Sequence, residues 1–347
     1  MNPVKTAIAS YGMSGEVFHA PFLHTNPKFE LVKVLERTKN RSLEKYPYIT
    51  VMKTYEDIIH DPEIELVIVN TPDHTHYELA KKALIAGKHV IVEKPFVQKV
   101  TDGEELIRIS HDHNKILSVF QNRRWDGDFL TVKKIIEDKV LGKIVEFEIH
   151  FDRFRNYIKE GSWREDASTG TGTVFNLGSH LIDQALILFG QPQSVTADVR
   201  ILRPGGSIDD YFNIWLDYPE IKVILKSTYL AKEPGAKFTV HGMNGSFIKF
   251  GVDPQEEMLK AGHWPDEKDW GKDLEEFYGK LNTKLNHEDI NCRVKTIPGN
   301  YKVYFDNIYE AIREKTGLLV TPEQALDNIR IIEAVFLSHK EKRSIVF

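Results

Sequence analysis

Near its start the chain reads Thr6-Ala7-Ile8-Ala9-Ser10-Tyr11-Gly12-Met13-Ser14-Gly15. An apolar run that leads directly into closely spaced glycines is typical of a strand, a tight turn and a helix that bind the phosphates of a dinucleotide. Gly12 would let the backbone approach a pyrophosphate, and Gly15 would let the following helix pack closely and point its N-terminus at the phosphates. Ser10 replaces the first glycine of the motif G-x-G-x-x-G, so an ordinary strand-to-helix turn stays open as the alternative.

The next hundred residues repeat one pattern. Short apolar runs alternate with helical patterns, as in a parallel sheet with crossover helices. The expected strands are 6–10, 29–35, 66–70, 89–93 and 116–120, and the expected helices lie near 15–22, 55–60, 75–86 and 102–113. Gly87 stands where the end of a helix favours a residue with positive φ. These elements predict a doubly wound α/β domain, a Rossmann fold, over residues 1–122.

The hydrophobic period changes after about residue 123. Val145, Phe147, Ile149 and Phe151 alternate with polar residues, which gives one apolar face, as in an antiparallel sheet. Further strands are expected at 195–202, 211–218, 221–230 and 238–250, the last with the hairpin turn signal Asn244-Gly245. Helices are expected over 301–315 and from Thr321, where Thr, Pro and Gln suit a capping box. Residues 123–347 are therefore predicted to form an α+β domain on a large, mostly antiparallel sheet, with 253–298 unassigned.

The composition excludes several classes of protein. The 347 residues carry 46 Lys and Arg against 51 Asp and Glu, a net charge of -5 without a long basic run, which argues against nucleic-acid binding. Cys292 is the single cysteine, so the sequence excludes a disulfide framework and indicates a reducing compartment. No apolar stretch reaches the roughly 18 residues of a membrane span, and the first ten residues lack the apolar core of a signal peptide. We expect a cytoplasmic protein without a metal site, since its histidine pairs are two residues apart and point to different sides.

The end of the second expected strand bears on the choice of cofactor. Glu36 lies 21 residues after Gly15, near where an acidic residue binds the ribose hydroxyls of NAD. Arg37, Thr38 and Lys39 follow and are suited to the 2′-phosphate of NADP instead. The two interpretations conflict, and plain solvated loop charges are a third. The basic run favours NADP over NAD.

Two further groups of residues are suited to catalysis. Lys94, in Glu93-Lys94-Pro95, follows a strand at the sheet edge where such folds bind ligands, and its charge can stabilise a developing alkoxide. Asn176, His180 and Asp183 share one face if a helix begins near Asn176, and the imidazole is suited to general acid–base work. Taken alone, a lysine in the position of Lys94 is more often a surface charge than a catalyst. Likewise, a histidine in the position of His180 more often serves helix packing.

Several short motifs occur in an order and spacing that span nearly the whole chain: Gly12 and Gly15 followed by Phe18-His19-Ala20-Pro21, Thr71-Pro72-Asp73-His74-Thr75-His76, Ala86-Gly87-Lys88-His89-Val90, Glu93-Lys94-Pro95, Gln121-Asn122-Arg123-Arg124-Trp125-Asp126, and Asn176 to Asp183. Together they resemble the glucose–fructose oxidoreductase, inositol dehydrogenase and rhizopine-catabolism (Gfo/Idh/MocA) family. Within it, the segments 122–130, 162–164, 209–212 and 271–281 are most similar to bacterial NADP-dependent scyllo-inositol dehydrogenases.

The resemblance implies an N-terminal Rossmann domain, a C-terminal α/β domain whose open sheet serves oligomerisation, and a nicotinamide cofactor between them. Lys94 would bind and activate the substrate hydroxyl, and His180 would accept its proton. The chain departs from the family at Asn176, where many members carry Asp and where an amide can orient a hydroxyl but cannot act as a base. Ser10 for glycine and Glu36 for a small polar residue are the other departures.

The leading hypothesis is an NAD(P)-dependent oxidoreductase that transfers a hydride between the nicotinamide and a ring carbon of a polyol or sugar, such as an inositol. Its catalytic residues would be Lys94, His180 and Asn176. The expected cofactor-binding residues are Gly12, Met13, Ser14, Gly15, Glu36, Arg37, Thr38, Thr71, Pro72, His76, Glu93, Lys94, Asn122, Trp163 and Arg164. The expected substrate-binding residues are Lys94, Arg155, Tyr157, Asn176, His180 and Tyr211.

Three alternatives stay open. An NAD-dependent glycosidase could oxidise a sugar transiently, eliminate and re-reduce it. A non-catalytic regulator could bind the cofactor without turnover, and a reductase of small carbonyls or dihydrodiols would use the same residues in a more apolar cleft. The expected partners are a small-molecule substrate and further copies of the chain, as a homodimer or homotetramer through the antiparallel sheet, with no nucleic acid and no membrane.

Overall fold

The structure, a computed structural model, describes residues 2–167 and 171–347. The chain forms two compact units. Unit 1 comprises Met1–Asn122, Gln255–Trp270 and Asn300–Asp327, and unit 2 comprises Arg123–Pro254, Gly271–Gly299 and Asn328–Phe347. The first segment of unit 1 ends at Asn122, but two later segments return to this unit, so a single boundary after residue 122 does not describe the division.

The described residues of unit 1 form a parallel sheet of six strands in the order β3-β2-β1-β4-β5-β6. The strands are β1 Val4–Ile8, β2 Phe29–Leu35, β3 Thr50–Met52, β4 Leu66–Val69, β5 His89–Val92 and β6 Leu117–Val119. β4 is buried along its whole length, as a strand covered on both faces is. The strand order reverses between β1 and β4, where doubly wound sheets bind ligands. The predicted Rossmann sheet is confirmed, with β3 as an addition.

The helices of unit 1 are α1 Ala20–Thr25, α2 Ser42–Lys45, α3 Glu56–Ile59, α4 His76–Ile85, α5 Val100–Asp112, α8 Gln255–Lys260 and α9 Lys302–Arg313. A π-helical turn, η1 Gly15–His19, leads into α1, and a 3₁₀ turn, η2 Asp73–Thr75, leads into α4. Gly87 follows α4 with a φ of 78°, as predicted. Phe305 of α9 stacks on Phe22 of α1 with ring centroids 5.2 Å apart, so a late segment of the chain completes the core of unit 1.

The last long helix, α10 Pro322–Glu341, begins in unit 1 and ends in unit 2. The N–H of Gln324 donates to Thr321 Oγ1 and the N–H of Thr321 donates to Gln324 Oε1, both at 3.3 Å. The predicted capping box is confirmed.

In unit 2, nine strands of the described part pair in the order β14-β13-β12-β11-β7-β10-β9-β8-β15. They are β7 Ile144–His150, β8 Ser194–Arg200, β9 Tyr211–Asp217, β10 Lys222–Thr228, β11 Phe238–Gly242, β12 Gly245–Lys249, β13 Gly279–Leu285, β14 Glu288–Val294 and β15 Ile345–Val346. Neighbouring strands run antiparallel except β7 and β10, which run parallel. The predicted mostly antiparallel sheet is confirmed.

Two strands of this sheet, β13 and β14, lie in the segment left without assignment. β13 buries Gly279, Leu281 and Thr283, and β14 is mostly exposed, so neither shows the alternation of large apolar residues that identifies a strand. The β11–β12 hairpin pairs Gly242 with Gly245, so its turn is Met243-Asn244, one residue earlier than the sequence indicated.

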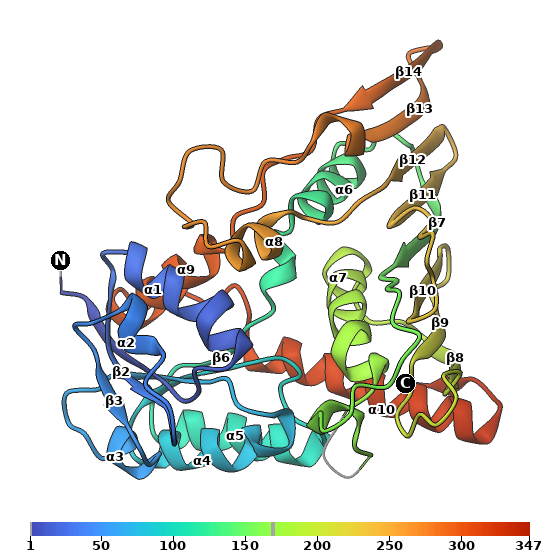
Figure 1. Ribbon diagram of the computed structural model, residues 1–347. Helices are drawn as coiled ribbons and strands as arrows, with labels where there is room; N and C mark the ends of the chain where they lie inside the picture. Colours follow the sequence, from blue (N-terminus) through green and yellow to red (C-terminus); the bar gives the residue numbers. More distant parts are fainter. Residues whose placement is uncertain (1, 168–170) are drawn as a thin grey trace. The chain divides into compact units, whose positions relative to one another are not determined.

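Helices α6 Gly127–Glu137 and α7 Ser179–Phe189 lie on the same side of the sheet (Figure 1). A π-helical turn, η5 Val174–Gly178, precedes α7, and the 3₁₀ turns are η3 Asn122–Trp125, η4 Trp163–Glu165 and η6 Glu275–Phe277. Phe147 and Leu225 are fully buried on one face of the sheet. Trp215, Ile224 and Glu148 lie side by side across β9, β10 and β7 on the opposite face, where Trp215 is 47% exposed.

Candidate active site

The turn after β1 has the form that a phosphate-binding turn requires at Gly15. A Cβ there would lie 2.1 Å from Ser10 O and 2.9 Å from Asn70 Nδ2, so no larger residue fits. Asn70 Nδ2 donates to Ser10 O at 2.8 Å, which ties the end of β4 to this turn. The close packing of η1 against the strands therefore depends on glycine.

Ser10 folds back into the same turn. Its Oγ accepts the N–H of Gly12 at 3.3 Å, and a Cβ on Gly12 would meet this hydroxyl alone, at 3.5 Å. The Ser14 hydroxyl contacts Asn70, at 3.2 Å from its Nδ2 and 3.4 Å from its carbonyl oxygen, while Met13 is 46% exposed at the tip. The first N–H groups of a helix have no acceptor inside it, so this turn can receive an anion on the exposed side of Gly12.

The Glu36 carboxylate, at the end of β2, is bound by its own loop. Oε1 accepts the N–H and the hydroxyl of Ser42 at 2.9 and 2.5 Å, and Oε2 accepts the N–H of Arg41 at 3.0 Å. Burial acts to raise the pKa of this carboxyl, but the hydrogen bonds from Ser42 and Arg41 outweigh it and lower the pKa. Arg37 and Thr38 follow on the exposed side of the turn.

His76 links the ends of two neighbouring strands. Its Nδ1 lies 2.8 Å from Pro95 O, after β5, and its Nε2 lies 2.9 Å from Thr71 O, after β4. Thr71 Oγ1 lies 2.6 Å from Thr75 Oγ1, which in turn donates to Pro72 O at 2.6 Å. His76 is buried, and its contacts position the Thr71-Pro72 turn.

Glu93 positions the backbone at Lys94. Its Oε1 lies 2.9 Å from Nε2 of the buried His19, and its Oε2 accepts the N–H of Lys94 at 3.0 Å. The Lys94–Pro95 peptide is cis. Asn122, at the end of the first segment of unit 1, is buried after β6. Lys94 is half-buried at the carboxyl end of β5, on the sheet that also carries the Gly12–Gly15 turn.

In unit 2, Asp209 holds the start of the segment that carries Asn176 and His180. Its Oδ2 accepts the N–H of Val174 and the hydroxyl of Thr173, both at 2.8 Å. A Cβ on Gly172 would lie 1.9 Å from Asp209 Oδ1, so a glycine is required there as well. The helix begins at Val174, close to the predicted start, but as a π turn.

Asp183, which the predicted helix face groups with His180, has both carboxylate oxygens bound by a side chain outside that helix. Arg124 binds it through two hydrogen bonds, Nε to Oδ2 at 2.8 Å and Nη2 to Oδ1 at 2.7 Å. This buried, bidentate pair ties α7 to η3. His180 is itself 5% exposed in the first turn of α7.

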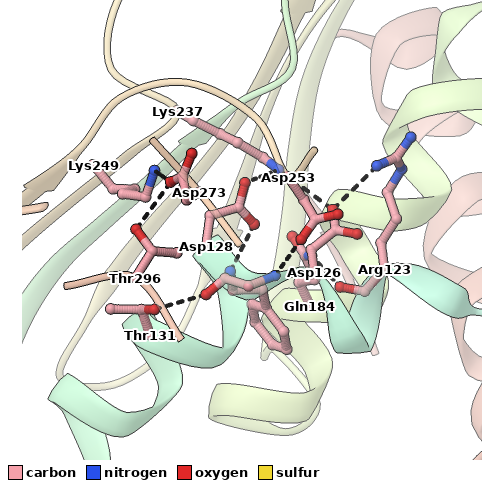
Figure 2. A network of polar contacts seen from close by, with 12 residues as sticks. Arg123, Asp126, Asp128, Thr131, Gln184, Lys237, Lys249, Asp253, Asp273 and Thr296 are labelled. Carbon is pink, nitrogen blue, oxygen red and sulfur yellow. Dashed lines mark hydrogen bonds and ion pairs between the residues drawn. The ribbon is translucent and has the colours of Figure 1, made fainter. Parts of the chain in front are cut away.

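A buried network of charges fixes α6 and α7 in unit 2 (Figure 2). Lys237 Nζ lies 2.6 Å from Asp128, and Arg123 Nη1 lies 3.1 Å from Asp126. Gln184 of α7 donates to Arg123 O at 2.9 Å. The helix that carries His180 is therefore held by polar contacts as well as by its apolar face, which the spacing of residues did not reveal.

Tyr229, which sequence reasoning missed, lies beside Asn176. Asn176 Nδ2 donates to Tyr229 Oη at 3.4 Å. The guanidinium groups of Arg155 and Arg203 lie 5.5 and 5.0 Å from the centre of the Tyr229 ring. Arg203 also pairs with Asp210 at 2.9 Å. Asn176 and Arg155 thus both contact Tyr229. In the sequence, the position of Tyr229 near the end of a predicted strand was the one feature that could have indicated it as a site residue.

The other predicted residues of unit 2 are more exposed. Tyr157 is 61% exposed, and Tyr211 is half-buried at the start of β9. Trp163 and Arg164 lie in η4, with the Arg164 guanidinium 5.2 Å from the centre of the Trp163 ring. No group of three or more possible metal ligands occurs within residues 2–167 and 171–347. Over the same residues, no helix has the length and apolar character to cross a membrane.

Two family models match most of the chain. The model described as the oxidoreductase family's NAD-binding Rossmann fold matches residues 4–121. The model described as the oxidoreductase family's C-terminal alpha/beta domain matches residues 133–347.

Named relatives and solved structures are similar to the chain. Scyllo-inositol 2-dehydrogenase (NADP(+)) IolW of Bacillus subtilis is 41% identical over 346 residues, which are 100% of this chain and 96% of the relative. Levoglucosan dehydrogenase of Pseudarthrobacter phenanthrenivorans is 33% identical over 162 residues, which are 44% of this chain and 42% of that relative. The structure of an oxidoreductase from Bacteroides fragilis has a TM-score of 0.92 at 46% identity, with 100% of both chains covered. That of YvaA from Bacillus subtilis has a TM-score of 0.95 at 40% identity, covering 100% of this chain and 99% of the other.

The family models cover both parts of the chain, and the named relatives match the same architecture. The parallel sheet and the second, mostly antiparallel sheet agree with this two-domain architecture. The chain belongs to the Gfo/Idh/MocA family and is an oxidoreductase with an NAD-binding Rossmann fold.

Proposed function

We propose that the protein transfers a hydride between a nicotinamide cofactor and a ring carbon of a polyol or sugar of the inositol type. The observation that carries this proposal is Lys94 at the carboxyl end of β5, on the same parallel sheet as the Gly12–Gly15 turn. The names of two relatives, a scyllo-inositol dehydrogenase and a levoglucosan dehydrogenase, support a cyclic substrate that carries hydroxyl groups.

The turn at Gly12 and Gly15 fits a dinucleotide, because its close backbone contact leaves no room for a side chain at Gly15. Gly12, Met13, Ser14 and Gly15 would hold the pyrophosphate, and Thr71 and Pro72 would line the cofactor further along the sheet edge. When bound, the nicotinamide supplies the acceptor or donor of the hydride. NADP is the cofactor we favour, as the basic residues after Glu36 suggest.

The residues of the chain handle the hydroxyl group and its proton. Lys94 would donate a hydrogen bond to the reacting hydroxyl and stabilise the negative charge that develops on its oxygen. His180 would accept the proton at a ring nitrogen. Asn176, bound to Tyr229, would orient a neighbouring hydroxyl through its amide. Arg155, Tyr157 and Tyr211 are candidates for the remaining hydroxyls.

Substitution of the two central residues tests this assignment. Because His180 and Lys94 act on the reacting oxygen, His180→Ala and Lys94→Met should each lower kcat with the best polyol by roughly 10²- to 10⁴-fold. His241→Ala and Lys99→Met, on residues outside the proposed site, should retain the wild-type rate. Wild-type turnover in a folded His180→Ala or Lys94→Met protein would contradict the proposal.

We also propose a homo-oligomer that acts in the cytoplasm. The face of the second sheet with Trp215, Ile224 and Glu148 lies opposite the face of Phe147, whose ring packs against Phe189 of α7. On this face the half-exposed Trp215 lies next to Ile224, and we infer that a second copy of the chain covers these apolar side chains. The single, exposed Cys292 is suited to a reducing compartment.

A further inference from the structure

We propose that Glu36 is a positioning residue that builds a subsite for the 2′-phosphate of NADP, with Arg37 as the residue that contacts the phosphate. The inference rests on the proposed function, since it requires a dinucleotide on unit 1. It reverses the role expected from the spacing, in which a carboxylate at this place binds the ribose of NAD and repels a 2′-phosphate.

The hydrogen bonds of Glu36 leave little room for a ribose. A carboxylate offers about four lone-pair sites, and the bonds from Ser42 N–H, Ser42 Oγ and Arg41 N–H occupy three of them. The residue is 8% exposed. Two ribose hydroxyls that bind side by side need two acceptor sites, which this carboxylate does not offer without opening its loop.

Lys53 holds the same loop from the other side. Its Nζ lies 3.0 Å from Glu36 O, 3.3 Å from Lys39 O and 2.7 Å from Asn40 Oδ1, which uses all three of its donors. The hydrogen bonds of the Glu36 carboxylate and those of Lys53 together hold residues 36–42 in one turn, which ends at the start of α2. The side chains of Arg37 and Lys39 are left on its exposed side.

The charges around this turn favour an anion. Glu16 is paired with Arg41 at 2.5 Å and lies 3.7 Å from Lys45, so its charge is matched. Within the described part of the chain, neither Arg37 nor Lys39 has an ion pair. A guanidinium directly after β2, beside the strand that carries the phosphate turn, is the group that accommodates a 2′-phosphate in dinucleotide-binding folds.

The two roles of Glu36 predict opposite effects of its removal. If Glu36 binds the ribose, Glu36→Gln weakens NAD binding and strengthens NADP binding, because a repulsive charge is lost. If Glu36 positions the turn, Glu36→Gln weakens binding of the 2′-phosphate, because an amide nitrogen cannot accept the N–H of Arg41. Ser42→Ala, which removes one donor to Glu36 and leaves its charge, should act in the same direction.

The test is equilibrium binding of 2′,5′-ADP and of 5′-ADP by calorimetry, which needs neither substrate nor turnover. We expect wild-type protein to bind 2′,5′-ADP more tightly, and Arg37→Gln to lower that affinity about 10- to 100-fold while 5′-ADP is little affected. Glu36→Gln and Ser42→Ala should lower it in the same selective way. Arg108→Gln, on the exposed surface of α5, is the matched control and should change neither affinity.

Equal affinities of wild type for the two nucleotides, or tighter 2′,5′-ADP binding by Glu36→Gln, would overturn the inference. If the Glu36→Gln protein fails to fold, the affinities of Arg37→Gln and Ser42→Ala for the two nucleotides decide the test. Selective 2′,5′-ADP binding without oxidation of any polyol would instead refute the proposed function and leave this inference standing. Oxidation of polyols with NAD, together with no preference for 2′,5′-ADP, would support the proposed function and refute this inference.

Discussion

Glu93 carries a buried charge directly before Lys94. Burial acts to raise the pKa of its carboxyl, but the hydrogen bond and electrostatic attraction of His19, together with the nearby Lys94, outweigh it and hold the pKa below the ordinary value of 4.5. A carboxyl whose pKa is lowered by folding stabilises the folded state above its unfolded pKa and loses that contribution as the pH falls through the lowered value. Glu93 thus links the geometry at Lys94 to acid stability.

Glu93→Gln should therefore lower the free energy of unfolding at pH 7 by about 1.5–3 kcal/mol, because a hydrogen bond to a charged group is lost. The difference from wild type should shrink only as the pH falls below 4.5 and through the lowered pKa of Glu93, where the wild-type carboxylate becomes protonated. Urea unfolding at a series of pH values measures this difference in the free energy of unfolding. Glu44→Gln, on the exposed side of α2, is the control. A difference that stays constant with pH would show that the charge of Glu93 does not stabilise the fold.

At this scale the sequence located residues better than it assigned their roles. Gly15, Lys94 and His180 lie where the strand ends and helix start were expected. The role of Asp183 could not be predicted, because its partner Arg124 lies 59 residues away in the chain. The role of Glu36 could not be predicted either, because the N–H groups of Arg41 and Ser42 that bind its carboxylate come together only when the loop folds.

Two helices that lie next to candidate residues, α1 and α7, begin in an unusual way. η1 precedes α1 and η5 precedes α7, and each is a five-residue π turn with a glycine at one end, Gly15 or Gly178. π turns are rare and occur frequently at functional sites. A five-residue segment is too short for its hydrophobic period to separate a π turn from an α turn, so the sequence could predict the helices but not their form.

Asp209 is expected to control the second of these turns. Asp209→Ala removes the acceptor for Val174 N–H and Thr173 Oγ1 and should lower the free energy of unfolding by about 0.5–2 kcal/mol, as loss of a helix cap does. It should also raise KM for the polyol, since the turn carries Asn176. Asp209→Asn keeps one oxygen and should retain most of both properties. Denaturation and steady-state kinetics check this, and an unchanged Asp209→Ala protein would exclude the capping role.

For the whole molecule, length and the change of hydrophobic period predicted two sheets of different kinds. The return of two late segments to unit 1 was not predictable, because it depends on packing between distant aromatic residues. Trp270 lies edge-on to Phe22 at 6.2 Å between ring centroids, and Trp264 lies 6.2 Å from Tyr46. Nothing in the local pattern around Trp264 and Trp270 identifies these partners.

The proposed assembly is also a property of the whole molecule. Trp215→Glu places a charge on the face that a second copy is proposed to cover, so it should convert the oligomer to monomers, as measured by light scattering coupled to size exclusion. Met243→Glu, at a hairpin tip where Met243 is 72% exposed, should leave the mass unchanged. A wild-type protein that is monomeric at micromolar concentration would contradict the proposed assembly.

Transfer of deuterium from substrate to cofactor tests the central claim most directly. Inositols deuterated at the ring carbons, incubated with the protein and NADP, should yield reduced nicotinamide that carries the label at C4, since the hydride passes directly between the two carbons. Lys94→Met and His180→Ala should form this product at strongly reduced rates. No reduced cofactor over a panel of labelled inositols, aldoses and polyols with NADP and NAD, or reduced cofactor whose C4 hydrogen comes from water, would contradict the account.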